Sequence, residues 1–305
     1  MMKPVSFGAL ALLACAATSL LQYSPSALSQ TVRANTMPES LKSIRQATGV
    51  CHKDDLPPGL APLIQDVRPD MSCALTGAAL AGLQRHPDTV LLDVRQESDF
   101  AAFHIAGALN PTLSDLHSKP YWRNKTTVLA GNGKAERELY SECARLKQLG
   151  YKDVKVLRGG LPSWLAAGQP VSGRAPSPVQ AATLSAAQFW LESQNPDNLV
   201  LLDKDQAAFQ NDVPFSVVMP VVTATSIGAM VEKARAAFKH APLAAVVVVT
   251  GAPLPHEQAA ALQRALLPMP MLFYAEGRAG LRRQVAVQKA VWQAQAHGPK
   301  LPSCG

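Results

Sequence analysis

Short apolar runs alternate with helical patterns of hydrophobic residues along most of this chain. Residues 75–100 and 184–209 repeat one order of elements. Each segment begins with a Thr or Ser suited to cap a helix, and continues through a short helical pattern and a Pro-Asp turn. Each then reaches an apolar strand that ends in Asp. The repeat predicts two copies of one structural unit.

Both copies continue with a further strand and helix. The apolar runs 127–130 and 245–250 are each followed by a glycine, a helical pattern and a second glycine-bearing segment. Strands that alternate with helices predict crossover connections, and therefore a parallel sheet with helices on both faces. Continuous apolar strands are typical of a sheet that is buried on both faces. The predicted fold class is therefore α/β, in two domains.

The domain boundaries follow from the limits of the two copies. We expect domains at residues 75–172 and 184–292, joined by a linker at 173–183 that is rich in Pro, Ser and Ala. Residues 30–74 form an N-terminal extension, and residues 293–305 form a C-terminal tail. A length of 305 residues suits two domains of this size.

The first 29 residues have the pattern of a signal peptide. Residues 5–21 are almost unbroken apolar and small, and a polar Pro/Ser stretch follows them. Ala27 and Ser29 are the small residues expected before a cleavage site, so we expect cleavage before Gln30 and a periplasmic or secreted protein. The alternative is a lipoprotein anchored at Cys15, because the residues before it roughly resemble a lipobox. After cleavage we expect no stable transmembrane segment.

Charge and composition argue against two classes of function. The net charge of +7 is scattered along the chain and aromatic residues are only 6%, so we expect no nucleic-acid partner. The chain has no Cys-x-x-Cys motif, and only His52 lies close to a cysteine, so we expect no metal site. No cofactor is indicated.

The five cysteines are too few for a disulfide scaffold. An exported chain lies in an oxidising compartment, where cysteines can pair. Cys51, Cys73 and Cys304 lie in predicted tails and loops and are the candidates for one bridge, with the pair left open. Cys143 lies in a helical pattern of leucines, so we expect it to be a small core residue.

A linked set of motifs in the first copy resembles the rhodanese, or sulfurtransferase, family. Residues 91–110 read LLDVRQESDFAAFHIAGALN and resemble the family's first signature, a strand with Asp-Val-Arg and then His-Ile-x-Gly-Ala. Residues 156–168 read VLRGGLPSWLAAG and resemble its closing signature, Gly-Gly-x-x-x-Trp. The second copy keeps the strand and helix order but has lost most motif residues. The resemblance implies two tandem rhodanese-like domains, of which the second is degenerate.

The resemblance also implies a chemistry for which this chain lacks the usual nucleophile. In the family, one Cys at the start of the loop after the fourth strand takes a sulfane sulfur from a donor such as thiosulfate and passes it on as a persulfide. The thiolate is the reactive form. That position is Gly131 in the first copy and Gly251 in the second. We therefore expect no catalytic residue there and no standard persulfide catalysis, and we leave open whether the chain is an enzyme.

The loop at residues 131–137 keeps features of an anion-binding site. Its two glycines permit a tight curl with N–H groups turned inward, and Lys134 and Arg137 add positive charge near a helix N-terminus. The alternative is a glycine-rich turn with solvated Lys and Arg, in which Glu136 helps to cap the helix. The candidate anion-binding residues are Gly131, Asn132, Gly133, Lys134, Ala135, Glu136 and Arg137.

The other motif residues are expected to be structural. We expect an ion pair at the strand end, a hydrogen-bonding histidine, a packed tryptophan and a glycine turn, from Asp93, Arg95, His104, Trp164, Gly159 and Gly160. The helix after the loop carries Glu138, Glu142 and Arg145, which we expect to be solvated.

Three functions remain open at this point. The first is an exported, non-catalytic rhodanese-like protein that binds an anion, a sulfur species or a partner protein through loop 131–137. The second is an active thiosulfate-type sulfurtransferase with a displaced nucleophile, Cys73 or Cys51. The third is a structural partner in an envelope assembly, which would use the outer faces and the cysteine-bearing tails.

Overall fold

The apolar runs of the first half form a four-stranded parallel sheet, in a computed structural model that describes residues 67–237 and 243–297. The strand order is β1 (Ala74–Leu75), β5 (Asp153–Leu157), β4 (Thr126–Ala130) and β2 (Thr89–Asp93). Strands β2 and β4 pair in parallel from Thr89 opposite Thr126 to Asp93 opposite Ala130. All strands therefore end at one edge of the sheet, and the loop after β4 begins there.

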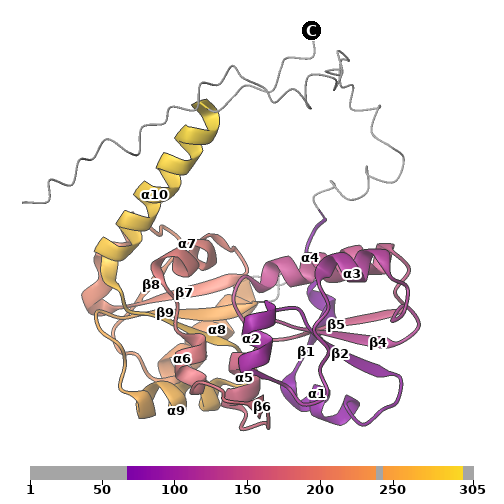
Figure 1. Cartoon of the computed structure of the whole chain (residues 1–305). Helices are drawn as coiled ribbons and strands as arrows, with labels where there is room; N and C mark the ends of the chain where they lie inside the picture. Colours follow the sequence, from indigo (N-terminus) through magenta and orange to yellow (C-terminus); the bar gives the residue numbers. More distant parts are fainter. Residues whose placement is uncertain (1–66, 238–242, 298–305) are drawn as a thin grey trace, which may run out of the picture. The chain divides into compact units, whose positions relative to one another are not determined.

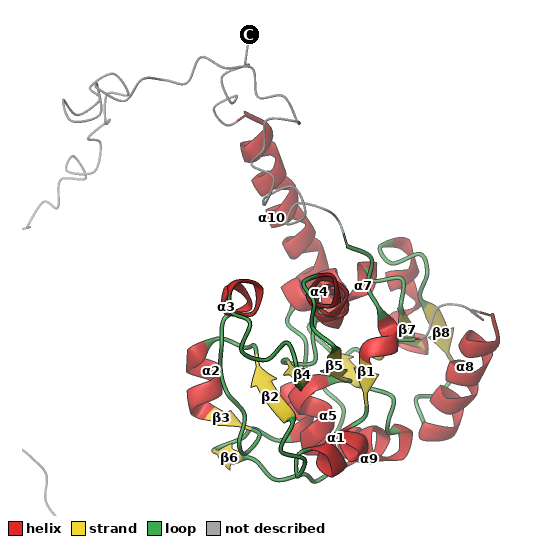
Figure 2. Cartoon of the chain, turned by 90° about the vertical axis from the view of Figure 1, so that its right-hand side faces the viewer, coloured by secondary structure: helices red, strands yellow, loops and turns green. Residues whose placement is uncertain are grey.

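Helices cover both faces of this sheet. Figures 1 and 2 show α3 and α4 on one face and α1 and α5 on the other. Two separate cores match these layers, one between the sheet and α3 and α4, the other between the sheet and α1 and α5. The helices are α1 (Gly77–Leu83), α2 (Glu97–Ala102), α3 (Leu113–Ser118), α4 (Glu136–Gln148) and α5 (Gly160–Ala166).

The second half forms another four-stranded parallel sheet. Its order is β10 (Met271–Tyr274), β9 (Ala245–Val249), β7 (Asn198–Asp203) and β8 (Val217–Met219). Every residue of β9 is buried, as expected for a central strand between two helix layers.

A short antiparallel ribbon joins β3 (Phe103–His104) to β6 (Ser172–Gly173) in the first half.

The helices of the second half form two groups. Helix α7 (Ala186–Gln194) packs against α10 (Gly277–His297), whereas α9 (His256–Leu266) packs against α6 (Pro178–Ala182) and α8 (Ala224–Ala237). Figure 1 shows α7 and α9 on opposite sides of the sheet. Two short 3-10 segments, η5 (Met71–Cys73) and η6 (Lys204–Asn211), complete the described elements.

The predicted helix starts of the two repeats are confirmed. The Thr76 hydroxyl caps α1 by accepting a hydrogen bond of 3.3 Å from the Ala79 N–H. Ser185 caps α7 through a capping box with Gln188. Each cap satisfies N–H groups that the first turn of a helix leaves without backbone partners.

Two predicted boundaries differ from the structure. The predicted linker 173–183 contains α6, because Ser177 forms a capping box with Gln180 and Pro178 occupies the first helical turn. Ala182 at the end of this helix is fully buried in the core of the second half. Helix α10 continues to His297, five residues into the predicted tail 293–305. The predicted signal peptide 1–29 and most of the predicted extension 30–74 lie outside the described residues.

Both sheets belong to one compact unit of the chain. In residues 67–237 and 243–297, no helix has the length and apolar character needed to cross a membrane. Across the same residues, no group of three or more His, Cys, Asp or Glu side chains is placed to hold a metal ion.

Candidate functional site

Loop 131–137 begins directly after β4, at the carboxyl edge of the first sheet. Ligands of open parallel α/β sheets bind outside this edge. Gly131 is buried, and its carbonyl accepts a hydrogen bond of 3.0 Å from the Leu161 N–H. A Cβ added to Gly131 would lie 2.7 Å from Leu139 Cδ1. The Leu139 side chain therefore fills the space that a larger residue at position 131 would need.

The loop packs against the glycine turn of the closing motif. Gly133 has a φ of +74°, and a Cβ there would lie 2.5 Å from the Gly159 carbonyl oxygen. Gly160 has a φ of +50°, and a Cβ there would lie 2.4 Å from the Gly131 carbonyl oxygen. The two glycine-bearing segments thus meet backbone to backbone, and side chains at these positions would separate them.

Lys134 does not extend into solvent from the loop. Its Nζ donates hydrogen bonds to the Thr183 carbonyl at 2.7 Å and to Gln188 Oε1 at 3.2 Å, both at the start of the second half. Its backbone N–H donates to Asn132 Oδ1 at 2.9 Å. Burial lowers the pKa of Lys134, and the nearby Glu192 carboxylate partly offsets this. The expected solvated lysine is therefore a contact between the two halves.

Two more loop groups contact the same region of the second half. The backbone N–H of Ala135 donates a hydrogen bond to Glu192 Oε1 on α7. Arg137 Nη1 forms an ion pair of 2.7 Å with Asp197 Oδ2 in the turn that follows α7. Arg137 is exposed, as the solvated alternative expects, and it also pairs with Asp197. Within the described chain, loop 131–137 is an interface between the two halves.

Glu136 is buried rather than placed at the surface to cap a helix. Its side chain is 5% exposed, and Ala135, in the left-handed conformation, occupies the N-cap position of α4. Burial raises the pKa of Glu136 to about 7, while the backbone N–H groups of Gly159 and Gly160 and the Arg158 guanidinium act in the opposite direction. Sequence reasoning assigned Glu136 to capping because it cannot tell that the closing motif covers it.

We expect Glu136→Gln to change the pH dependence of stability. A carboxyl whose folded-state pKa is about 7, above its ordinary 4.5, stabilises the fold fully below about pH 4.5. That contribution is lost as the pH rises through 7, and amounts to up to about 3 kcal/mol. Relative to the wild type, the variant should gain this amount between pH 4.5 and pH 8. Urea unfolding at several pH values measures it, and a constant difference between the two proteins would contradict the assignment.

A pocket of about 550 Å³ lies beside the loop. It is lined by loop residues, the strand end at Arg95, helix α4 and Val67. The polar lining groups carry both charges, with basic groups from Arg95, Lys134 and Arg145 and acidic groups from Glu138 and Glu142. Of the predicted loop residues, the pocket includes Gly131, Asn132, Lys134 and Ala135.

The predicted ion pair at the end of β2 is present and buried. Arg95 Nε lies 2.9 Å from Asp93 Oδ1, and Arg95 Nη2 lies 2.7 Å from Asp93 Oδ2, with side chains that are 6% and 1% exposed. Arg95 Nη2 also donates to the Phe103 carbonyl at 2.6 Å, and its guanidinium lies over the Phe103 ring. The pair fixes the strand end that forms one wall of the pocket.

His104 and Trp164 hold neighbouring parts of the scaffold. A ring nitrogen of His104 is hydrogen-bonded to the Phe100 carbonyl at 2.9 Å, and the two rings stack with centroids 4.1 Å apart. Trp164 is buried, and its Nε1 donates to the Pro170 carbonyl at 2.9 Å. Neither residue is among those that line the pocket beside the loop.

The charged face of α4 is only partly solvated. Glu138 is exposed as expected, but the Glu142 side chain is 4% exposed and bonds to His117 Nε2 and to Arg145 Nη1. Helix α3 supplies His117 and covers this part of α4. The expectation of a solvated Glu142 is therefore wrong, because His117 from α3 and Arg145 cover its carboxylate.

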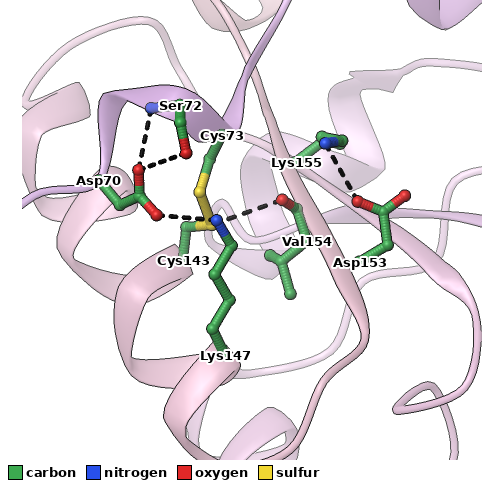
Figure 3. The surroundings of a disulfide bond; sticks show 8 residues. All are labelled: Asp70, Ser72, Cys73, Cys143, Lys147, Asp153, Val154 and Lys155. Atoms are coloured by element: carbon green, nitrogen blue, oxygen red, sulfur yellow. Dashed lines mark hydrogen bonds and ion pairs between the residues drawn. A yellow bond between two sulfur atoms is a disulfide. The ribbon is translucent and has the colours of Figure 1, made fainter.

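A buried disulfide bond joins Cys73 to Cys143, a pairing that sequence reasoning did not predict. Figure 3 shows the bond between η5 and α4, beside the ion pair between Asp70 and Lys147. Cys143 is buried as expected, but it is a half-cystine rather than a free core residue. Cys73 was one of the three disulfide candidates, and the other two, Cys51 and Cys304, lie outside the described residues.

Sequence reasoning also missed Glu192 as a site residue. Its Oε2 accepts a hydrogen bond of 2.6 Å from Asn198 Nδ2, and its Oε1 accepts one from the Ala135 N–H. The capping pattern at Ser185 predicts the helix that carries Glu192, but no signal in that pattern indicates contact with a loop of the other half. In the second half, Gly251 follows β9 and is exposed.

Comparisons with known proteins characterise the first half of the chain. The sequence model of the rhodanese-like domain family matches residues 76–167. A tRNA uridine(34) hydroxylase from Bacillus pumilus is 30% identical over 115 residues, covering 33% of this chain and 34% of that protein. The match therefore spans about a third of the length of the curated relative.

Solved structures that resemble parts of this chain include a rhodanese-like domain and a longer protein. A rhodanese-like domain from Anabaena is 27% identical, covers 35% of this chain and 86% of that chain, and gives a TM-score of 0.30. A thiosulfate sulfurtransferase from Pseudomonas aeruginosa is 21% identical, covers 69% of this chain and 42% of that chain, and gives a TM-score of 0.29.

Proposed function

Since residues 76–167 form a rhodanese-like domain, we propose that this is an exported rhodanese-like binding protein without persulfide chemistry. Its ligand is a small anion or sulfur oxyanion, bound in the pocket beside loop 131–137. The observation that carries the proposal is the pocket itself, which joins loop residues to Arg95 and Arg145 and has no thiol among the lining residues that the structure describes.

The state of the cysteines supports the absence of persulfide chemistry. Persulfide formation needs an accessible thiolate. In the described part of the chain the cysteines are Cys73 and Cys143, and both are fully buried in the disulfide bond. Cys73 is therefore not available as the displaced nucleophile of the alternative sulfurtransferase function. Cys51 lies outside the described residues.

Unused hydrogen-bond donors support an anionic ligand. Arg145 lines the pocket, and its Nη1 bonds to Glu142. The hydrogen bonds that the structure shows for Arg95 use Nε and Nη2. A planar guanidinium with free N–H groups suits an oxyanion with several acceptor atoms.

The two sheets support a tandem origin. Both are parallel, and the order β5-β4-β2 in the first corresponds to β10-β9-β7 in the second. An isolated bridge beside β2 at Leu109 matches the position of β8, and a bridge at Thr183 matches the position of β1. We therefore treat the second half as a degenerate rhodanese-like domain. The disulfide bond supports export, because such bonds persist in oxidising compartments.

The test combines mass spectrometry with ligand titration of the purified mature protein. After incubation with thiosulfate, we expect no added sulfur atom on the intact mass and no thiocyanate when cyanide is present. Either product would overturn the non-catalytic assignment and would direct attention to Cys51. Thiosulfate, sulfite or phosphate should raise the melting temperature, because a ligand at 100 times its dissociation constant adds about 2.7 kcal/mol of stability.

A matched pair of variants locates the binding site. Arg145 and Arg235 each form an ion pair through Nη1 with a glutamate three residues earlier in a helix, but only Arg145 lines the pocket. We expect Arg145→Gln to abolish the anion-dependent rise in melting temperature and Arg235→Gln to leave it unchanged. Equal responses in both variants would place the anion elsewhere. No response in the wild type would leave a structural role in an envelope assembly.

A further inference from the structure

The loop of the first half already holds an anionic group, which comes from the second half. Glu192 reaches from α7 to the loop, where its Oε1 accepts the Ala135 N–H. Lys134 lies close enough to Glu192 for their charges to interact. Ala135 and Lys134 are also lining residues of the pocket beside the loop. Ala135 and Lys134 thus interact with the internal carboxylate and also border the space proposed for an external anion, although Glu192 itself is not among the described lining residues.

From this shared use we propose that Glu192 is an autoinhibitory internal ligand of loop 131–137, which an external anion must displace to bind the loop. The inference rests on the proposed function, because it concerns access to the same pocket. It adds a form of regulation: binding of an anion in the pocket is coupled to the contact that Glu192 makes between the two halves.

The surroundings of Glu192 shift its pKa in both directions. Its side chain is buried, and burial raises the pKa of Glu192. The Ala135 N–H, the Asn198 side chain and the positive charge of Lys134 act in the opposite direction, while Glu138 adds to the rise. Most of the groups that favour the charged form are therefore supplied by the loop itself.

Two neighbouring interactions link Glu192 to the rest of the interface between loop 131–137 and the second half. Lys134 Nζ is bonded to Thr183 and Gln188, and Arg137 is paired with Asp197. These partners flank Glu192 on both sides in sequence. Asp197 binds the Arg137 side chain of the loop, whereas Glu192 binds the loop backbone at Ala135. Removing Asp197 therefore tests the effect of weakening the contact between the two halves. Removing Glu192 tests the effect of vacating the backbone N–H.

The experiment removes the internal carboxylate and supplies acetate as a replacement. In Glu192→Ala, we expect sodium acetate to raise the melting temperature in a saturable way, beyond the effect of sodium chloride at equal ionic strength. This excess should be smaller in the wild type and in Asp197→Ala, where Glu192 still accepts the Ala135 N–H. An equal effect of both salts on Glu192→Ala, or no effect, would overturn the proposal.

A second variant covers the case in which Glu192→Ala does not fold. Glu192→Gln keeps the side-chain volume and an acceptor for the Ala135 N–H but removes the charge, and neutral acceptors form weaker hydrogen bonds than carboxylates. We expect its affinity for thiosulfate to rise by about tenfold over the wild type, equivalent to about 1.4 kcal/mol. An unchanged affinity would overturn the proposal while the wild-type binding still supported the proposed function. Acetate rescue without any thiosulfate binding would support Glu192 as an internal ligand and overturn the proposed anion-binding function.

Discussion

The double variant Cys73→Ala/Cys143→Ala is expected to lose about 4 kcal/mol of unfolding free energy relative to the oxidised wild type. The bond joins residues that are 70 positions apart, and a cross-link over a loop of this length strongly restricts the unfolded chain. Alanine avoids the additional cost of a buried hydroxyl, because both cysteines are fully buried. Guanidinium unfolding, followed by tryptophan fluorescence, measures the loss.

Reduction provides the control for this prediction. A reductant should destabilise the wild type by a similar amount and should leave the alanine variant unchanged. Equal stability of the oxidised and reduced wild type would show that the bond does not constrain the unfolded chain. The ion pair between Lys147 and Asp70, which is partly exposed and lies beside the bond, should contribute at most about 1 kcal/mol.

The disulfide bond also bears on the candidate site. It ties η5 to α4, and the backbone N–H of Asp70 donates to the Tyr140 carbonyl of the same helix. Helix α4 begins at the end of loop 131–137 and carries three of the charged groups that line the pocket, Glu138, Glu142 and Arg145. A destabilised α4 would therefore reduce anion binding in addition to global stability.

The strands and the starts of the repeated helices could be predicted because their signals are local. An apolar run such as β9 is long enough to be buried on both faces, and a Ser or Thr before a helical pattern caps it whatever packs nearby. Gly133 and Gly160 were likewise placed in the loop and in the closing motif, and their positive φ angles suit glycine. These features need no knowledge of distant contacts.

The partners of buried charged residues could not be predicted, because they depend on which elements pack together. The position of Cys143 on its helix indicates burial but not that η5 delivers Cys73 to it. In the same way, Glu142 is covered by His117 from α3, and Glu192 meets a loop from the other half of the chain. In each case the deciding partner lies at least 25 residues away in the sequence.

The second large effect is expected at the end of β2, beside the pocket. Asp93→Asn should lower the free energy of unfolding by about 3–5 kcal/mol, because it leaves the buried Arg95 guanidinium without its counter-charge. The Asn amide would also place N–H donors against those of Arg95, whose Nε and Nη2 bond the two carboxylate oxygens of Asp93.

Two comparison variants separate charge removal from simple substitution. Glu232→Gln breaks an exposed pair with Arg235 and should cost less than about 1 kcal/mol. The double variant Asp93→Asn/Arg95→Gln should be less destabilised than the sum of its two single variants, because no uncompensated charge then remains buried. Additive losses, measured by urea unfolding at one pH, would mean that the two side chains act independently. Since Arg95 lines the pocket, coupling in this cycle would also identify Asp93 as the residue that positions the Arg95 guanidinium for an anion.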